Sequence, residues 1–152
     1  MPRMLVRGLL VLWCLGCFAG LRAAAESAVA YRRVDVAPTK TSIYIGTVSM
    51  TTQPFERKDA GYEARYTAKV FPYFFHNESG RLRIEISAAQ LETLARGEPI
   101  EFAGRGVRED GVERRIEGKA TPADATTGKV KVRVFVSKRI ELIFNTTYRF
   151  ER

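Results

Sequence analysis

The stretch that decides the fold is residues 129–150, KVKVRVFVSKRIELIFNTTYRF. Its large apolar side chains share even-numbered positions: Val130, Val132, Val134, Val136, Ile140, Leu142, Phe144, Tyr148 and Phe150. Successive side chains of a strand point to opposite faces of a sheet, so this parity predicts strands with one buried face. A three-residue loop at 137–139 would pair Val136 with Ile140 and keep that face continuous, although one long bent strand would share the parity. We favour the hairpin.

The same period of two recurs upstream, in residues 43–50, 62–70 and 81–86. Residues 71–75 are expected to continue the second of these strands in an extended conformation. Further on, a glycine ends residues 109–111, which predicts a three-residue hairpin loop. That loop would set Phe102 opposite Gly118, an arrangement in which a large side chain packs over a glycine on the neighbouring strand.

One short helix interrupts the strands at residues 88–96. Ser87 is placed to cap it, and Gln90 lies at the spacing of a capping box. Gly97 and Pro99 are typical of the end of a helix. The fold class predicted is therefore all-β, an antiparallel β-barrel or β-sandwich of about seven or eight strands with one short helix.

Residues 1–25 have the composition of a secretory signal peptide. Arg3 and Arg7 precede an apolar run at 9–21, and 23–25 supply the small residues that precede cleavage. The run is too short and too interrupted for a membrane-spanning helix, which needs about 18 apolar residues. We expect an exported protein, periplasmic or secreted, with residues 26–152 as a single β domain. A retained anchor or a lipid-modified Cys17 is the alternative.

Removal of that segment would change the chemistry of the chain. Cys14, Cys17 and Trp13, which are both cysteines and the only tryptophan, lie within it. Loss of its three arginines lowers the formal net charge from +8 to +5, which does not indicate a nucleic-acid partner. The remaining domain would have no disulfide and no thiolate ligand, so its own core must hold it together.

The aromatic run Phe71, Tyr73, Phe74 and Phe75 is a possible binding surface. Consecutive side chains of an extended segment point to both faces of a sheet, so one core can cover only about half of them. The rest need a second cover, which could be the helix at 88–96, the segment before residue 40, a ligand or a protein partner. Exposed contiguous aromatics often mark an interaction site.

A second candidate surface is the basic stripe of Lys129, Lys131 and Arg133, which share one strand face. Such stripes can bind phosphates or acidic polymers, but lysines also protect sheet edges from aggregation. His76 is the only histidine and lies in a predicted turn. A metal site needs several ligands, and only Glu78 is close in sequence, so we expect a solvated turn residue.

The sequence favours a non-enzymatic exported domain that binds a small apolar ligand inside a barrel, or a protein or envelope partner through residues 71–75. A polyanion-associated envelope protein using residues 129–133 is the alternative, and a hydrolase with two unidentified carboxylates is a third. We predict no catalytic residue, no metal ligand and no cofactor. Membrane association is expected only if the signal segment is retained or lipidated.

Overall fold

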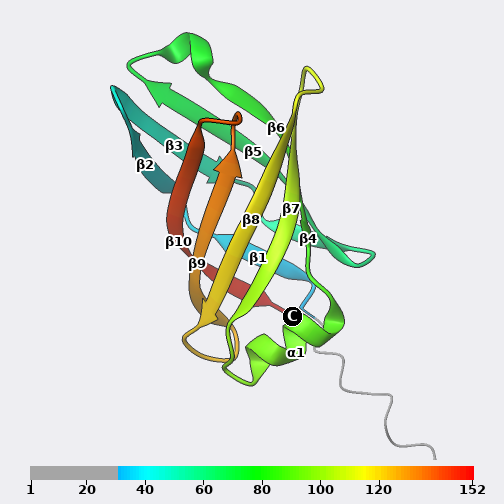
Figure 1. Ribbon diagram of the computed structural model, residues 1–152. Helices are drawn as coiled ribbons and strands as arrows, with labels where there is room; N and C mark the ends of the chain where they lie inside the picture. The colour runs from blue at the N-terminus through cyan, green and yellow to red at the C-terminus, as the bar shows by residue number, and fades with distance from the viewer. Residues whose placement is uncertain (1–30) are drawn as a thin grey trace, which may run out of the picture.

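The computed structural model of the protein describes residues 31–152 (Figure 1). The predicted signal peptide, residues 1–25, lies outside these residues. Ten strands, one α-helix and a short 3-10 helix follow one another as β1 (Arg33–Val36), β2 (Thr39–Ile43), β3 (Gly46–Thr52), β4 (Phe55–Lys58), β5 (Gly61–Phe71), η1 (Phe74–His76), β6 (Glu78–Glu85), α1 (Ala88–Ala95), β7 (Ile100–Arg108), β8 (Glu113–Pro122), β9 (Thr127–Phe135) and β10 (Glu141–Glu151).

Eight of the strands close into an antiparallel barrel. β1 and β4 to β10 form a continuous ladder, and β5 completes the ring by pairing with β4 on one edge and β6 on the other. The remaining two strands, β2 and β3, form a hairpin that continues the sheet from the upper part of β5 (Figure 1). The all-β prediction is confirmed, and of the two predicted architectures the barrel is the one observed.

The hairpin registers predicted from the sequence are also confirmed. In the β9–β10 hairpin the Val136 amide donates to the Ile140 carbonyl, and the ladder continues with Leu142 opposite Val134. The inward positions therefore stay apolar across the turn, as their shared parity requires.

The β7–β8 hairpin shows the same agreement between sequence and register. Gly111 has a φ of +88°, the left-handed conformation that the end of a three-residue loop needs. Phe102 lies opposite Gly118, and its ring covers the glycine so closely that a Cβ built there would lie 2.1 Å from Cζ of Phe102. The glycine is needed for packing rather than for backbone conformation.

This contact predicts a coupled pair of substitutions. Gly118→Ala should lower the free energy of unfolding by about 1–3 kcal/mol, because the added methyl group overpacks against the Phe102 ring. In a Phe102→Ala background the same substitution should cost less than about 0.5 kcal/mol, because the ring is gone. Urea unfolding of the four proteins measures the difference, and equal costs in both backgrounds would contradict the packing role.

The lower end of the barrel is closed by the α-helix. The predicted capping box is present, since the Gln90 amide donates to the Ser87 hydroxyl and the Ser87 amide donates to the Gln90 side chain. Leu91 and Leu94 of α1 are buried against the end of the sheet. No helix within residues 31–152 is long and apolar enough to cross a membrane.

An aromatic stack fills the rest of the lower end. The Tyr31 and Phe150 rings are stacked with centroids 4.3 Å apart, and the Tyr62 hydroxyl donates to the Tyr31 carbonyl. The β8–β9 loop joins this layer, because its Thr126 carbonyl accepts from the Phe150 amide. Asp124 holds the loop in shape by accepting hydrogen bonds from the amides of Thr126 and Thr127.

The loop should make stability depend on pH through Asp124. Hydrogen bonds from the Thr127 hydroxyl and the two amides lower the pKa of this carboxyl from 3.8 to about 2. A lowered folded-state pKa contributes stability that is present above about pH 4 and is lost as the pH falls towards 2. Asp124→Asn should therefore have a lower urea midpoint of unfolding than the parent protein at pH 7. This difference in midpoint should narrow by pH 2. A difference in midpoint that does not change with pH would show that the charge of the Asp124 carboxylate does not cause the loss of stability.

Two segments differ from the expectation. Residues 71–75 do not continue the strand: β5 ends at Phe71, and the chain turns into η1. Pro72 has no amide to donate to a ladder, and the Asn77 side chain closes the turn by accepting from the Val70 amide. The segment before residue 40 shows little alternation, and Pro38 predicts irregular structure at its end, yet the segment contains β1 and the start of β2 on either side of Pro38.

One place in the barrel wall is held by few hydrogen bonds. The ladder between β1 and β10 ends at Val36 opposite Tyr148, and in the structure β2 pairs only with β3. Beyond that point the Ala37 amide donates to the Thr147 carbonyl, and two threonine side chains bridge the strands. They are Thr39, which donates to the Asn145 carbonyl, and Thr146, which donates to the Ala37 carbonyl. We call this region the β2–β10 seam.

Candidate functional site

The barrel contains an apolar cavity of about 130 Å³. Every strand of the ring contributes to its wall, and β2, β3 and α1 add to it. The wall includes Val34, Val36, Met50, Phe55, Leu82, Ile84, Phe102, Ile116, Val130, Val132, Val134, Leu142, Phe144 and Tyr148. Many of these are the inward residues that the alternating pattern predicted. A cavity of about 150 Å³ with such a lining stays dry and can bind benzene, so this space suits a compact apolar molecule.

Two charged side chains, Glu78 and Arg114, are the only ones among the described residues in the cavity wall. Both belong to the upper end of the barrel, Glu78 at the start of β6 and Arg114 near the start of β8. The Arg114 side chain is 14% exposed and that of Glu78 is 23% exposed. Charges so far from water require partners, and the structure supplies them.

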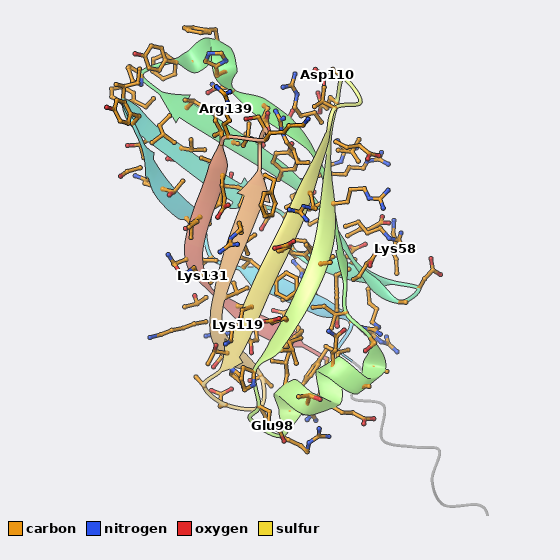
Figure 2. All side chains as sticks on the ribbon, viewed as in Figure 1. Lys58, Glu98, Asp110, Lys119, Lys131 and Arg139 are labelled. Carbon is orange, nitrogen blue, oxygen red and sulfur yellow. The ribbon has the colours of Figure 1, made fainter. Side chains whose placement is uncertain are left out.

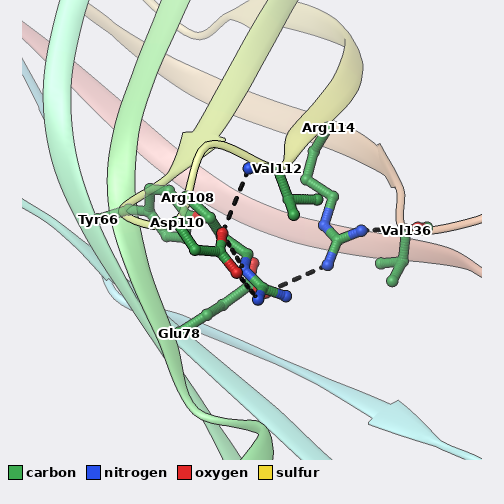
Figure 3. Close-up of polar contacts among 7 residues, drawn as sticks. All are labelled: Tyr66, Glu78, Arg108, Asp110, Val112, Arg114 and Val136. Carbon is green, nitrogen blue, oxygen red and sulfur yellow. Dashed lines mark hydrogen bonds and ion pairs between the residues drawn. The ribbon is translucent and has the colours of Figure 1, made fainter.

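Figure 3 shows how these partners meet. One Glu78 oxygen accepts from the Tyr66 hydroxyl at 3.1 Å, and the other accepts from Nη2 of Arg114 at 3.3 Å. Nη1 of Arg114 donates to the Val136 carbonyl at 2.8 Å. Arg108 lies 3.5 Å from the same Glu78 oxygen and is itself paired with Asp110. We call Tyr66, Glu78, Arg108 and Arg114 the polar cluster.

The electrostatics of the polar cluster keep the Tyr66 hydroxyl protonated. Burial, together with the adjacent Glu78 charge, raises the pKa of Tyr66 well above its ordinary value, so its hydroxyl remains a donor. Nε of Arg114 is buried and has no hydrogen-bond partner within residues 31–152. An unpaired buried donor costs about 1–3 kcal/mol, so the cluster is not arranged for stability alone.

The sequence contained a signal for this cluster that we did not use. Arg114 has the same parity as Ile116, and Glu78 the same parity as Leu82, so both are charges at inward positions. In a strand with one buried face, a charge on the inward parity indicates either the end of the core or a polar site within it.

The predicted aromatic surface is exposed at the upper end of the barrel. Phe71, Phe74 and Phe75 are 62%, 63% and 78% exposed, and Tyr73 is half-buried. The two expected covers from within the chain are not there, because α1 and the described part of the leading segment do not reach these rings (Figure 1). The rings contact one another instead, Phe71 against Phe74 and Tyr73 against Phe75, each pair at 5.8 Å.

The predicted basic stripe lies on the outer wall of the barrel, on β9. Lys129, Lys131 and Arg133 are all exposed there. Arg133 is neutralised by Glu141 of β10, whose oxygen lies 2.7 Å from its Nε. Lys119 of β8 lies directly opposite Lys131 in the ladder, so the basic surface spreads from β9 onto β8.

The structure also places His76 and the carboxylate of the cavity wall. His76 is exposed in η1 with its ring against Phe75, and residues 31–152 contain no group of three side chains able to hold a metal ion. Glu78 is the one carboxylate of these residues in the cavity wall. Glycoside chemistry needs two facing carboxylates, so the cavity lacks a partner for that role.

The chain matches none of the family models, curated proteins or solved structures with which it was compared. The site is therefore interpreted from its geometry.

The exposure of the aromatic segment gives a direct test of its role in folding. The double substitution Phe74→Ser with Phe75→Ser should change the free energy of unfolding by less than about 0.5 kcal/mol, because neither ring is in the core. Leu94→Ala in α1 should cost about 2–5 kcal/mol, because that side chain is buried at the closed end. Thermal and urea unfolding provide both values. A large loss of unfolding free energy in the double variant would show that the Phe74 and Phe75 rings contribute to the core.

Proposed function

We propose that the protein is an exported β-barrel that binds a compact apolar molecule in its central cavity. The observation that carries the proposal is the cavity itself, whose wall is mainly apolar, with polar side chains at the polar cluster and at three threonines. Protein interiors are packed with few voids larger than a water molecule, so a space of this size in the core needs an explanation. A bound apolar molecule would restore the dispersion contacts that the lining side chains lack.

The lining chemistry supports the choice of ligand class. Valine, leucine, isoleucine and phenylalanine side chains offer no hydrogen bonds, so binding would come from burial of apolar area, at about 25 cal/mol per Å². The polar cluster lies at one end, and both Glu78 oxygens, the Tyr66 hydroxyl and both terminal nitrogens of Arg114 already have partners. A strongly polar ligand would find few partners in this space.

The β2–β10 seam supports a route into the cavity. Ala37, Thr39 and Thr146 line the cavity and are also the residues whose few hydrogen bonds hold the seam. Segments with few backbone hydrogen bonds open at lower free-energy cost than the rest of a fold. Opening here would expose the apolar wall without breaking the ladder of the ring.

Export is part of the proposal and is supported by the sequence of residues 1–25. A domain without cysteine in its described residues needs no oxidising compartment to fold, and its core is sufficient to hold it. Such a barrel could carry or store an apolar molecule outside the cytosol.

The test uses benzene as a probe and native mass spectrometry for the natural ligand. Benzene should raise the Tm of the wild-type protein, because it binds the folded state alone. Val132→Phe, which fills the cavity from β9, should abolish that shift. The wild-type protein purified from its host should also carry a small apolar molecule that Val132→Phe lacks.

Ala120→Leu serves as a second cavity-filling variant, in case the phenylalanine disturbs the barrel. An exterior substitution of matched chemistry, Ile143→Phe on the outer face of β10, should leave the benzene shift intact. A wild-type Tm that benzene does not change would contradict the proposal, as would equal shifts in the wild type and both filled variants.

A further inference from the structure

We infer that the upper end of the barrel docks on an anionic lipid bilayer through a small group of exposed apolar side chains. These are Tyr44 and Ile45 of the β2–β3 turn with Phe71, Phe74 and Phe75 of the β5–β6 connection, and we call them the aromatic tip. The inference goes beyond ligand binding and does not depend on it. It also differs from membrane association through residues 1–25.

The aromatic tip is one structure built from two loops. Thr47 of β3 pairs with Phe71 of β5, so the β2–β3 turn lies against the β5–β6 connection. Gly46 makes this approach possible, because a Cβ built there would lie 2.2 Å from the Phe71 carbonyl oxygen. Figure 2 shows the aromatic rings of these loops projecting together beyond the ends of the strands.

The exposure of the aromatic tip is extreme for side chains of this kind. Tyr44 is 104% exposed and Ile45 is 62% exposed, which adds to the three exposed phenylalanines. Five of the eight large apolar side chains exposed in the described residues belong to the aromatic tip. A concentration of this kind indicates an interaction site rather than scattered surface residues.

Charges around the aromatic tip are segregated by sign, unlike those of the rest of the domain. Residues 36–55 and 64–77 form the tip and the parts of β2, β3 and β5 nearest to it, and they contain no carboxylate; the acids that flank these ranges are Asp35, Glu56, Glu63 and Glu78. They do contain Lys40, Arg65 and Lys69, which are exposed and make no ion pair with any residue of 31–152. These three cations complement anionic headgroups.

The lysines are set back from the rings by the distance that a bilayer interface requires. Lys69 precedes Phe71 by two residues, which is roughly 7 Å at the rise of a strand. Lys40 lies on the same outer face, because both lysines flank Ser49 in the ladder. Rings of Tyr and Phe at headgroup depth with lysines behind them are typical of interfacial anchors, which bury their apolar side roughly 5–10 Å.

A bilayer explains this surface better than a protein partner does. The cores of protein interfaces are depleted in lysine and fit a surface of complementary shape. The aromatic tip is instead a projection of two neighbouring loops beyond the ends of the strands (Figure 2). Insertion into an interface needs no shape complementarity, only apolar rings and cations at the right depth.

The experiment places a fluorophore at the aromatic tip of the protein in the form its host makes. Trp13 is the only tryptophan of the chain and lies outside the described residues, so the emission of Phe75→Trp minus that of the parent reports on the tip alone. Vesicles of phosphatidylcholine with phosphatidylglycerol should shift this emission to the blue. Pure phosphatidylcholine or high salt should reduce the apparent affinity at least fivefold.

Reversing the charge of the two lysines behind the aromatic tip, with a matched lysine pair as control, then tests whether these lysines contact the bilayer. In the Phe75→Trp background, Lys40→Glu with Lys69→Glu should weaken vesicle binding about 25-fold, or about fivefold per lysine. Lys119→Glu with Lys131→Glu reverses an exposed lysine pair on the barrel wall, well away from the aromatic tip (Figure 2), and should change binding less than twofold. Circular dichroism and Tm confirm that each variant is folded.

Three outcomes would overturn the inference. One is the absence of a blue shift with any vesicle, and another is an equal loss of binding in the two lysine variants. The third is a blue shift that appears without vesicles as protein concentration rises, together with a dimer by size-exclusion chromatography that Phe74→Ser with Phe75→Ser dissociates. That last result would assign the aromatic tip to a second copy of the chain.

Discussion

The arrangement of the whole molecule depends on the way β5 uses its two edges. This strand has eleven residues, and β6 occupies one edge along residues 61–68. The other edge is shared, with β4 paired to its lower part and β3 to its upper part. The chain changes role at the Gln53–Pro54 interruption, where the Gln53 amide donates to the Arg65 carbonyl. Below this point the strands close into a ring, and above it they diverge into a hairpin.

The proposed functions follow from that division. The closed lower part, sealed by α1 and the Tyr31–Phe150 stack, provides the floor of the cavity. The divergent upper part produces the β2–β10 seam and carries the aromatic tip at its far end. β2 connects the seam to the aromatic tip, since Thr39 lies in the seam and the strand ends at Ile43, directly before Tyr44. A bilayer contact at the tip would therefore place the seam near the membrane, where apolar molecules are concentrated.

The sequence predicted the local pairings well because alternation and turn chemistry are local properties. The parity of residues 129–150 and the glycine at 111 were enough to predict both registers, including the Phe102–Gly118 contact. Closure was beyond prediction, because the pairing of β1 with β10 joins residues more than a hundred positions apart. The polar cluster was missed for a related reason, since Glu78 and Arg114 are 36 positions apart on β6 and β8 and meet only across the intervening strand β7. Tyr44 and Ile45 joined the candidate surface through the β3–β5 register, which brings them beside Phe71.

The pairing of the first strand with the last also determines when the barrel can form. Arg33 lies opposite Glu151, so the ring stays open until residues 148–151 are available to pair with residues 33–36. Closing the ring is therefore a late step of folding, because contacts between distant residues must wait for both partners. A polypeptide that crosses a membrane through a narrow channel must remain unfolded until it has crossed. An exported chain with this order of strands would close its barrel only after residues 148–151 had crossed the membrane.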